Sequence, residues 1–234
     1  MYQTQKTYIQ PEMKMLDLIN QNPNLLLLLE HFKIDFAVAD KTVTDICREN
    51  NINITVFILI SNLYNGFFPE KVKIDSKDDI SLIITFLKNS HNYYQFNKYP
   101  EIKEYIQELH DKYQNEDIAM IEKFFSDYFK EVLEHLEYED KIAFPYFCSL
   151  IDSASEQVET EFSVNEYREH HGDIETKLTD LKNLLLKHIE LKNNLSIRRK
   201  FLNSLFELEY DLNIHSMIEE KILLPLIDDI EKKS

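Results

Sequence analysis

The sequence contains one motif twice, as His135-Leu-Glu-Tyr-Glu139-Asp-Lys-Ile-Ala-Phe-Pro145 and as His215-Ser-Met-Ile-Glu219-Glu-Lys-Ile-Leu-Leu-Pro225. Both copies follow the pattern H-x-x-x-E-[D/E]-K-I-x-[F/L]-P, and they lie 80 residues apart. A His and a Glu at this spacing project from the same face of an α-helix, one turn apart. Each copy therefore presents an imidazole and a carboxylate in the same direction, as a metal-chelating pair does.

The composition favours helices over strands. The chain has 234 residues but only 2 Gly and 6 Pro, too few for the many turns of a β-rich fold. Its length is sufficient for one domain with a full core, or for a small domain and a medium one. We therefore expect an all-α fold.

The charge and the cysteine content exclude several classes of function. A net charge of -16 argues against binding to nucleic acid or to an anionic membrane surface, which both attract Lys and Arg clusters. Cys47 and Cys148 are too few and too far apart for a disulfide framework or a thiolate metal site. No signal peptide is recognisable, and the longest apolar run, residues 25–29, is too short to span a bilayer. We expect a cytoplasmic protein.

Residues 1–75 are predicted to form a small helical domain. Helices are expected over residues 11–19 and 25–31, then after a Thr44 cap, and finally over residues 55–63. The last two resemble a helix-turn-helix, but the second of them contains no basic residue to meet DNA. The module is therefore not predicted to bind DNA.

Residues 78–234 are predicted to form an antiparallel four-helix bundle. Four segments carry apolar residues at alternating spacings of three and four, which is the pattern of amphipathic helices. Connected by short loops, four such helices form an antiparallel bundle. The apolar stripes cover residues 80–94, 121–146, 164–185 and 201–226, and an extra short helix is expected at about residues 101–112.

Polar residues interrupt each apolar stripe. Every stripe has one His in a position typical of Leu, and two stripes also carry a Glu, whose burial is costly unless it is paired or bound to a metal. The spacing repeats, with 80 residues from His91 to His171 and from His135 to His215. This register also favours His171 over the adjacent His170. The predicted metal ligands are His91, His135, Glu139, His171, His215 and Glu219.

The ligand types indicate which metal the site would hold. His nitrogen and Glu oxygen without thiolate, in a helical bundle, suit non-haem iron or manganese. We expect two iron ions, with Glu139 and Glu219 as bridges and two His on each metal, leaving positions open for oxygen, nitric oxide or peroxide. Four tyrosines lie near the ligand level, and one of them could hydrogen-bond a metal-bound ligand: Tyr94, Tyr128, Tyr138 and Tyr167.

The six ligands and the prolines that follow each H-x-x-x-E resemble the hemerythrin-like cation-binding domain, over about residues 80–230. Four His rather than the five of oxygen-carrying hemerythrins resemble the RIC (repair of iron centres) family. Residues 34–47 are similar to the ScdA-type domain that precedes the bundle in RIC proteins, although Ala37-Val38 stand where that domain has a Cys-Cys pair. Cys47 is predicted to be a packed residue.

The resemblance implies a di-iron protein of the oxidative and nitrosative stress response that assists repair of damaged iron–sulfur clusters. The alternative is a hemerythrin-like sensor or scavenger that binds oxygen or nitric oxide. A third reading is a redox enzyme that reduces nitric oxide or peroxide, so enzymatic activity stays open. The expected partners are a diatomic ligand, iron–sulfur client proteins, or both, with no nucleic acid and no membrane. The sequence leaves the oligomeric state open, a dimer included.

Overall fold

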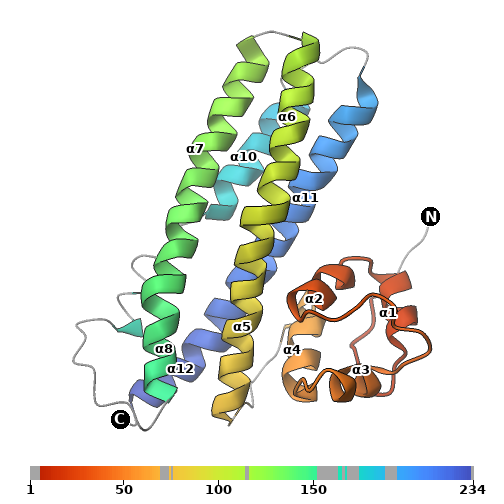
Figure 1. The fold of residues 1–234 in the computed structure, drawn as a ribbon, viewed down its shortest axis with the longest axis vertical. Helices are drawn as coiled ribbons and strands as arrows, with labels where there is room; N and C mark the ends of the chain where they lie inside the picture. The colour runs from red at the N-terminus through yellow and green to blue at the C-terminus, as the bar shows by residue number, and fades with distance from the viewer. Residues whose placement is uncertain are drawn as a thin grey trace. The chain divides into compact units, whose positions relative to one another are not determined.

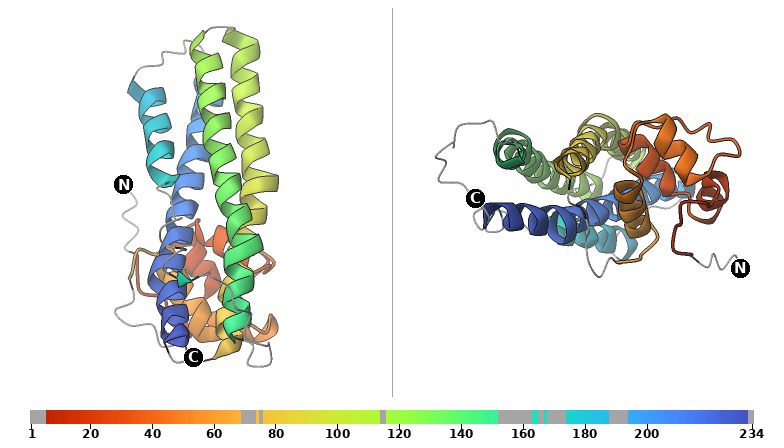
Figure 2. Two further views of the ribbon diagram at one scale, coloured as in Figure 1. Left: turned by 90° about the vertical axis from the view of Figure 1, so that its left-hand side faces the viewer. Right: turned by 90° about the horizontal axis from the view of Figure 1, so that it is seen from below.

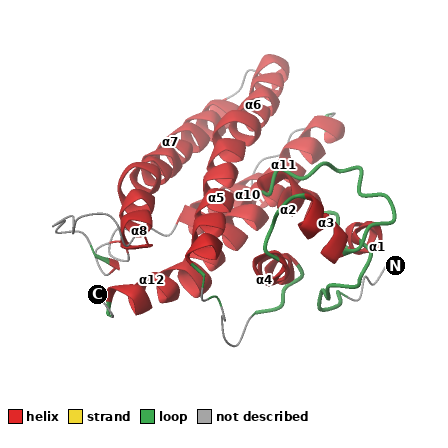
Figure 3. Cartoon of the chain, turned by 60° about the horizontal axis from the view of Figure 1, so that its bottom comes forward, coloured by secondary structure: helices red, strands yellow, loops and turns green. Residues whose placement is uncertain are grey.

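The computed structural model describes residues 6–68, 74, 76–113, 116–151, 163–164, 167, 174–187 and 194–232. These residues form helices and loops and contain no strand, as Figure 3 shows. The chain divides into two compact units, residues 1–90 with 214–234, and residues 91–213. The predicted all-α class is confirmed: bundle helices follow a helical N-terminal region. The predicted domain boundary near residue 75 stays a prediction.

Four short helices form the described part of the N-terminal region. Three lie close to where the sequence predicts them, whereas the first begins at Met15 rather than at Pro11, because residues 11–13 form a turn. The four helices are α1 (Met15–Gln21), α2 (Leu25–His31), α3 (Val43–Glu49) and α4 (Ile54–Tyr64). The cap of α3 corrects the prediction, because Thr42 rather than Thr44 occupies that position. The Thr42 hydroxyl accepts a hydrogen bond from the Asp45 amide while the Asp45 carboxylate accepts one from the Thr42 amide. This reciprocal pair satisfies two amides that the first helical turn leaves open.

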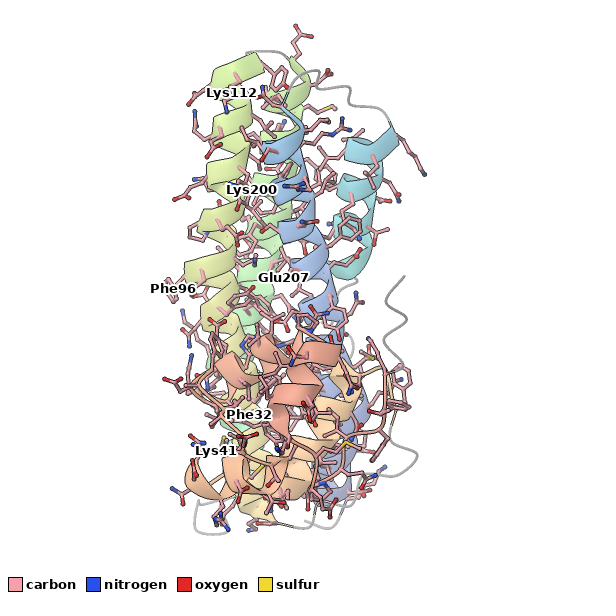
Figure 4. All side chains as sticks on the ribbon, turned by 90° about the vertical axis from the view of Figure 1, so that its right-hand side faces the viewer. Phe32, Lys41, Phe96, Lys112, Lys200 and Glu207 are labelled. Carbon is pink, nitrogen blue, oxygen red and sulfur yellow. The ribbon has the colours of Figure 1, made fainter. Side chains whose placement is uncertain are left out.

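The N-terminal helices pack together with the first part of α5 (Lys77–Tyr93). Asn62 in α4 bonds the amide and the carbonyl of Ile9, at 2.8 and 3.2 Å, and so holds the segment before α1. The ring of Phe32, labelled in Figure 4, lies 4.7 Å from that of Phe86 in α5. Asn89 of α5 also donates to the carbonyl of His31 at 2.8 Å. Apolar burial and these polar contacts together fix the region onto α5.

The α-helices of the bundle are labelled in Figure 1. Within residues 91–213, α7 packs against both α6 and α10. Tyr99 of α6 stacks on Phe129 of α7 with ring centroids 4.0 Å apart. The elements after α5 are η1 (Tyr94–Lys98), α6 (Tyr99–Tyr113), α7 (Glu116–Tyr138), η2 (Glu139–Ala143), α8 (Phe144–Ile151), α10 (Ile174–Lys187), α11 (Leu195–Ile218), η3 (Glu219–Leu223) and α12 (Leu224–Glu231).

Three of these elements, η1, η2 and η3, are π-helical, and each joins two α-helices without a break. Figure 2 shows α7 continuing through η2 into α8. The extra helix predicted at residues 101–112 is likewise a continuation of α5, through η1 into α6. The η1 segment exposes Phe96 on its outer side (Figure 4), while Lys98 is buried and lies 2.5 Å from Glu207 of α11.

Each π-segment stands at the same distance before a proline. Pro100, Pro145 and Pro225 each come two residues after the end of η1, η2 and η3. The residue just before each proline bonds its amide to the carbonyl five residues earlier, as Phe144 does to Glu139. A proline within a helix lacks an amide hydrogen and its ring clashes with the carbonyl four residues back. The wider π-turn accommodates that ring, and such turns often occur at functional sites.

Candidate metal centre

Glu139 is the centre of the polar cluster in residues 91–213. It is the first residue of η2, and its side chain is 0% exposed. His135, one turn earlier on α7, places Nε2 3.0 Å from Oε1 of Glu139. His91, near the end of α5, places Nε2 3.3 Å from Oε2. The two oxygens of one buried carboxylate therefore face two different histidines.

Residues next to this cluster hold His91 and Glu139 in place. The Nδ1 atom of His91 lies 3.1 Å from Oδ1 of Asp140, and its ring stacks on Phe144 at 5.5 Å. Tyr167 donates its phenolic hydrogen to Oε1 of Glu139 at 2.5 Å. Of the four candidate tyrosines, Tyr167 thus bonds a predicted ligand. A carboxylate that orients a histidine through Nδ1 is a frequent second partner at metal sites.

The second motif copy has the same local geometry in the other unit. His215 places Nε2 3.1 Å from Oε1 of Glu219, and both side chains are buried. Glu219 is the first residue of η3, as Glu139 is of η2. On the opposite edge of the ring, Nδ1 of His215 lies 2.8 Å from the hydroxyl of Ser90. The repeated sequence thus produces the same local arrangement twice: in each copy the His and the Glu project from the same face of their helix.

The donor set and its spacing fit a metal. With metal–ligand bonds of about 2.1 Å at right angles, two neighbouring ligand atoms lie about 3.0 Å apart. The His-Glu separations of 3.0, 3.1 and 3.3 Å are of this size. Burial of two carboxylates is costly unless cations or hydrogen bonds compensate it. Among the described residues, the side chains that could ligate a cation are His91, His135 and Glu139 in one unit and His215 and Glu219 in the other.

The structure places five of the six predicted ligands. His171, the sixth, lies outside the described residues, as do His170 and His188. The roles of Asp140 and Ser90 were not predicted. A signal for Asp140 was present, because both motif copies have an acidic residue directly after the glutamate. Ser90 comes directly before His91, and nothing in the local pattern distinguishes it from other helical serines.

A surface cavity of about 370 Å³ reaches the His91 side of the cluster. Its inner wall includes His91, and exposed side chains such as Gln95 and Glu137 form its rim. Leu133 and Leu136 also line it, so the cavity is partly apolar beside His91. Its lining residues are His91, Gln95, Leu133, Leu136, Glu137, Asp140 and Lys141.

The Cys47 thiol is far less acidic than a free cysteine. Its side chain packs inside the N-terminal region, and burial raises its pKa from 9.0 to about 12. A thiol in this state is a poor nucleophile and a poor metal ligand, because both roles require the thiolate. The prediction that Cys47 is a packed residue is confirmed.

Helices that present buried His and Glu side chains define a class of helical cation-binding proteins. The model of the hemerythrin HHE cation-binding domain matches residues 83–227, which is more than half of the chain. The chain therefore belongs to this family, and the predicted resemblance is confirmed at that level. No curated protein matches the chain. Among the described residues, no helix is both long and apolar enough to cross a bilayer.

Proposed function

We propose that the chain is a cytoplasmic non-haem di-iron protein of the RIC type, which assists repair of iron–sulfur clusters damaged by oxidants or nitric oxide. The observation that carries the proposal is the carboxylate of Glu139. Each of its oxygens faces a different histidine, His91 on one side and His135 on the other. A carboxylate in this arrangement is suited to bridging two metal ions, which is a common role of Glu in helical di-iron bundles.

The proposed ligand set divides evenly between two metals. Glu139 and Glu219 are the proposed bridges, and the four His provide two nitrogens for each metal, with His171 completing the set by its 80-residue spacing from His91. Nitrogen and oxygen ligands without thiolate favour iron over a structural zinc site. A pair of iron ions supplies open coordination positions to oxygen, nitric oxide or peroxide, and can give up iron to an acceptor.

The protein's own residues would control access and orientation. The carboxylate of Asp140 faces Nδ1 of His91 at 3.1 Å, while Nε2 of the same ring faces Glu139. Tyr167 bonds Oε1 of Glu139, which lowers the charge density on that oxygen. Phe144 covers one face of the His91 ring and keeps water from it. The cavity beside His91 is large enough for a diatomic molecule to approach the site.

The N-terminal region is proposed to contribute no thiol chemistry. Ala37 and Val38 occupy the place of the family's Cys-Cys pair, and Val38 is buried. Cys47 is the remaining thiol of this region, and its pKa of about 12 keeps it protonated at neutral pH. Repair by this chain is therefore proposed to rest on the iron of the bundle.

The test is reactivation of an iron–sulfur enzyme after damage by nitric oxide. Iron-loaded protein is expected to restore activity faster than the same amount of free ferrous iron. Glu139→Gln serves as the variant without a bridging carboxylate and is expected to be no better than free iron. Equal recovery with wild-type protein and free iron would overturn the repair function.

The cavity beside His91 favours a second candidate function, a sensor or scavenger of oxygen or nitric oxide. In this reading the bundle holds the gas and the N-terminal region reports to a partner. Optical spectra of the reduced, anaerobic protein before and after addition of each gas provide the test. A new absorption band is expected on binding, and unchanged spectra with both gases would remove this candidate.

A further inference from the structure

Ser90 occupies a buried position between a helix carbonyl and a proposed ligand. It lies in α5 and is 1% exposed. Its hydroxyl donates to the carbonyl oxygen of Leu87 at 2.6 Å. The same oxygen lies 2.8 Å from Nδ1 of His215. The Ser90 hydroxyl therefore has two short polar contacts, one with a carbonyl oxygen and one with an imidazole nitrogen.

The direction of the Ser90–Leu87 bond favours one tautomer of His215. A serine hydroxyl has one hydrogen, and here that hydrogen is given to Leu87. With its hydrogen given to Leu87, the Ser90 oxygen acts as an acceptor, which favours a hydrogen on Nδ1 of His215. In that tautomer the other ring nitrogen, Nε2, keeps its lone pair and points toward Glu219, whose Oε1 is 3.1 Å away.

We propose that Ser90 is a positioning residue for His215, holding its ring in the tautomer and orientation in which Nε2 can bind a divalent transition metal such as ferrous iron. The inference rests on the proposed metal-binding function of His215. Without the Ser90 oxygen, the ring can rotate about its side-chain bonds and can carry its hydrogen on Nε2 instead. That tautomer has no lone pair on the nitrogen that faces Glu219.

The comparison with His91 makes the effect specific to one ligand. Nδ1 of His91 faces the carboxylate of Asp140 at 3.1 Å, whereas Nδ1 of His215 bonds the neutral hydroxyl of Ser90. A carboxylate partner raises the basicity of the imidazole more than a hydroxyl does. The metal that His215 binds is therefore expected to be the more weakly held one, and to be lost first when Ser90 is changed.

The experiment compares three variants with the wild-type chain by anaerobic cobalt titration, followed through visible absorption. Ser90→Ala removes the hydroxyl, and Ser90→Thr retains it, since a helical threonine can also bond a carbonyl of the preceding turn. Ser61→Ala is the matched control, because Ser61 is 0% exposed and donates to the carbonyl of Ile58, at the same three-residue separation. Ser90→Ala is expected to weaken binding of one cobalt ion about tenfold, whereas Ser90→Thr and Ser61→Ala stay close to wild type.

A second readout is independent of metal. Nitrogen-15 NMR of the metal-free protein at pH 8 reports which nitrogen of His215 carries the hydrogen. The Nδ1–H form is expected in the wild type, and a shift toward Nε2–H is expected in Ser90→Ala. An Nε2–H form in the wild type, or equal cobalt affinity in Ser90→Ala and Ser61→Ala, would overturn the role of Ser90. Failure of the wild type to bind two metals would instead contradict the proposed function and leave the tautomer result to stand separately.

Discussion

At the scale of single residues, the buried Glu139 is costly to fold and informative about function. A fully buried carboxylate needs strong compensation. His91, His135 and Tyr167 surround it. These are all groups that can also serve a metal or its ligand, so the local cost is explained best by a bound cation.

Glu139→Gln separates the bridging role from the packing role. The amide keeps the shape of the side chain but loses the charge and one acceptor oxygen, so we expect fewer than two irons per chain. The metal-free variant is expected to gain about 1 kcal/mol or more in its free energy of unfolding, because a neutral group is easier to bury. Metal analysis and urea unfolding measure both effects. Glu137→Gln, an exposed neighbour that pairs with Lys141, is the control, and a full iron content in Glu139→Gln contradicts a bridge.

The 80-residue register makes a prediction about two adjacent histidines. Iron content is expected to fall strongly in His171→Ala and to stay near two per chain in His170→Ala. The physical reason is that only His171 stays in phase with the apolar stripe of its predicted helix. Metal analysis of the two purified variants decides between them, and the reverse result would show that the register is wrong.

The buried thiol of Cys47 predicts slow alkylation. Because burial raises its pKa to about 12, Cys47 stays protonated at pH 8. The stability contributed by burying the neutral thiol is lost only as the pH rises from about 9 through 12. Cys148 is only partly buried and is expected to react first with iodoacetamide in the native protein. Mass spectrometry of timed samples measures the order, and faster labelling of Cys47 would contradict the burial argument.

At the scale of elements, the π-segments are the main feature that regular helix rules do not anticipate. The four-residue spacing correctly predicted that His135 faces Glu139, because that pair lies just before the π-turn begins. Helical periodicity assumes a constant rotation per residue and so cannot show where the turn widens. The signal was the proline six residues after Glu139 and after Glu219, which the motif contains.

Pro145→Ala tests whether the π-turn serves the site. Alanine restores an amide hydrogen and removes the ring clash, so the helix can return to α-geometry and gain up to about 3 kcal/mol in the metal-free state. That change turns Phe144 by about 100° relative to α7, away from the His91 ring on which it stacks. We expect greater stability in urea and weaker cobalt binding. Pro11→Ala, outside the helices, is the control, and unchanged cobalt affinity would contradict a functional role for η2.

Contacts between elements mark the limit of prediction from sequence. The all-α class, the order of the helices and the H-x-x-x-E pairs follow from local patterns, which a single sequence contains. The partners of His91 and His215, by contrast, come from Asp140 and Ser90, which lie on other helices. Which residue of one helix meets a ring on another depends on the packing angles between helices, and no residue spacing encodes these angles.

At the scale of the whole molecule, charge and family agree with the proposed ion. A net charge of -16 attracts cations and disfavours anionic polymers. The hemerythrin HHE match extends over residues 83–227, a range that includes every proposed ligand. Membership of this family establishes cation binding. From the donor set we propose which ion is bound and how many ions there are.

Metal analysis of the protein purified without oxygen tests the di-iron assignment most directly. We predict two iron ions per chain and little zinc or manganese, because the two glutamates and four histidines supply a shared set of ligands for a pair. Reconstitution of the metal-free chain with ferrous iron is expected to saturate at the same ratio. A single bound ion per chain, or zinc that ferrous iron does not displace, would contradict the account.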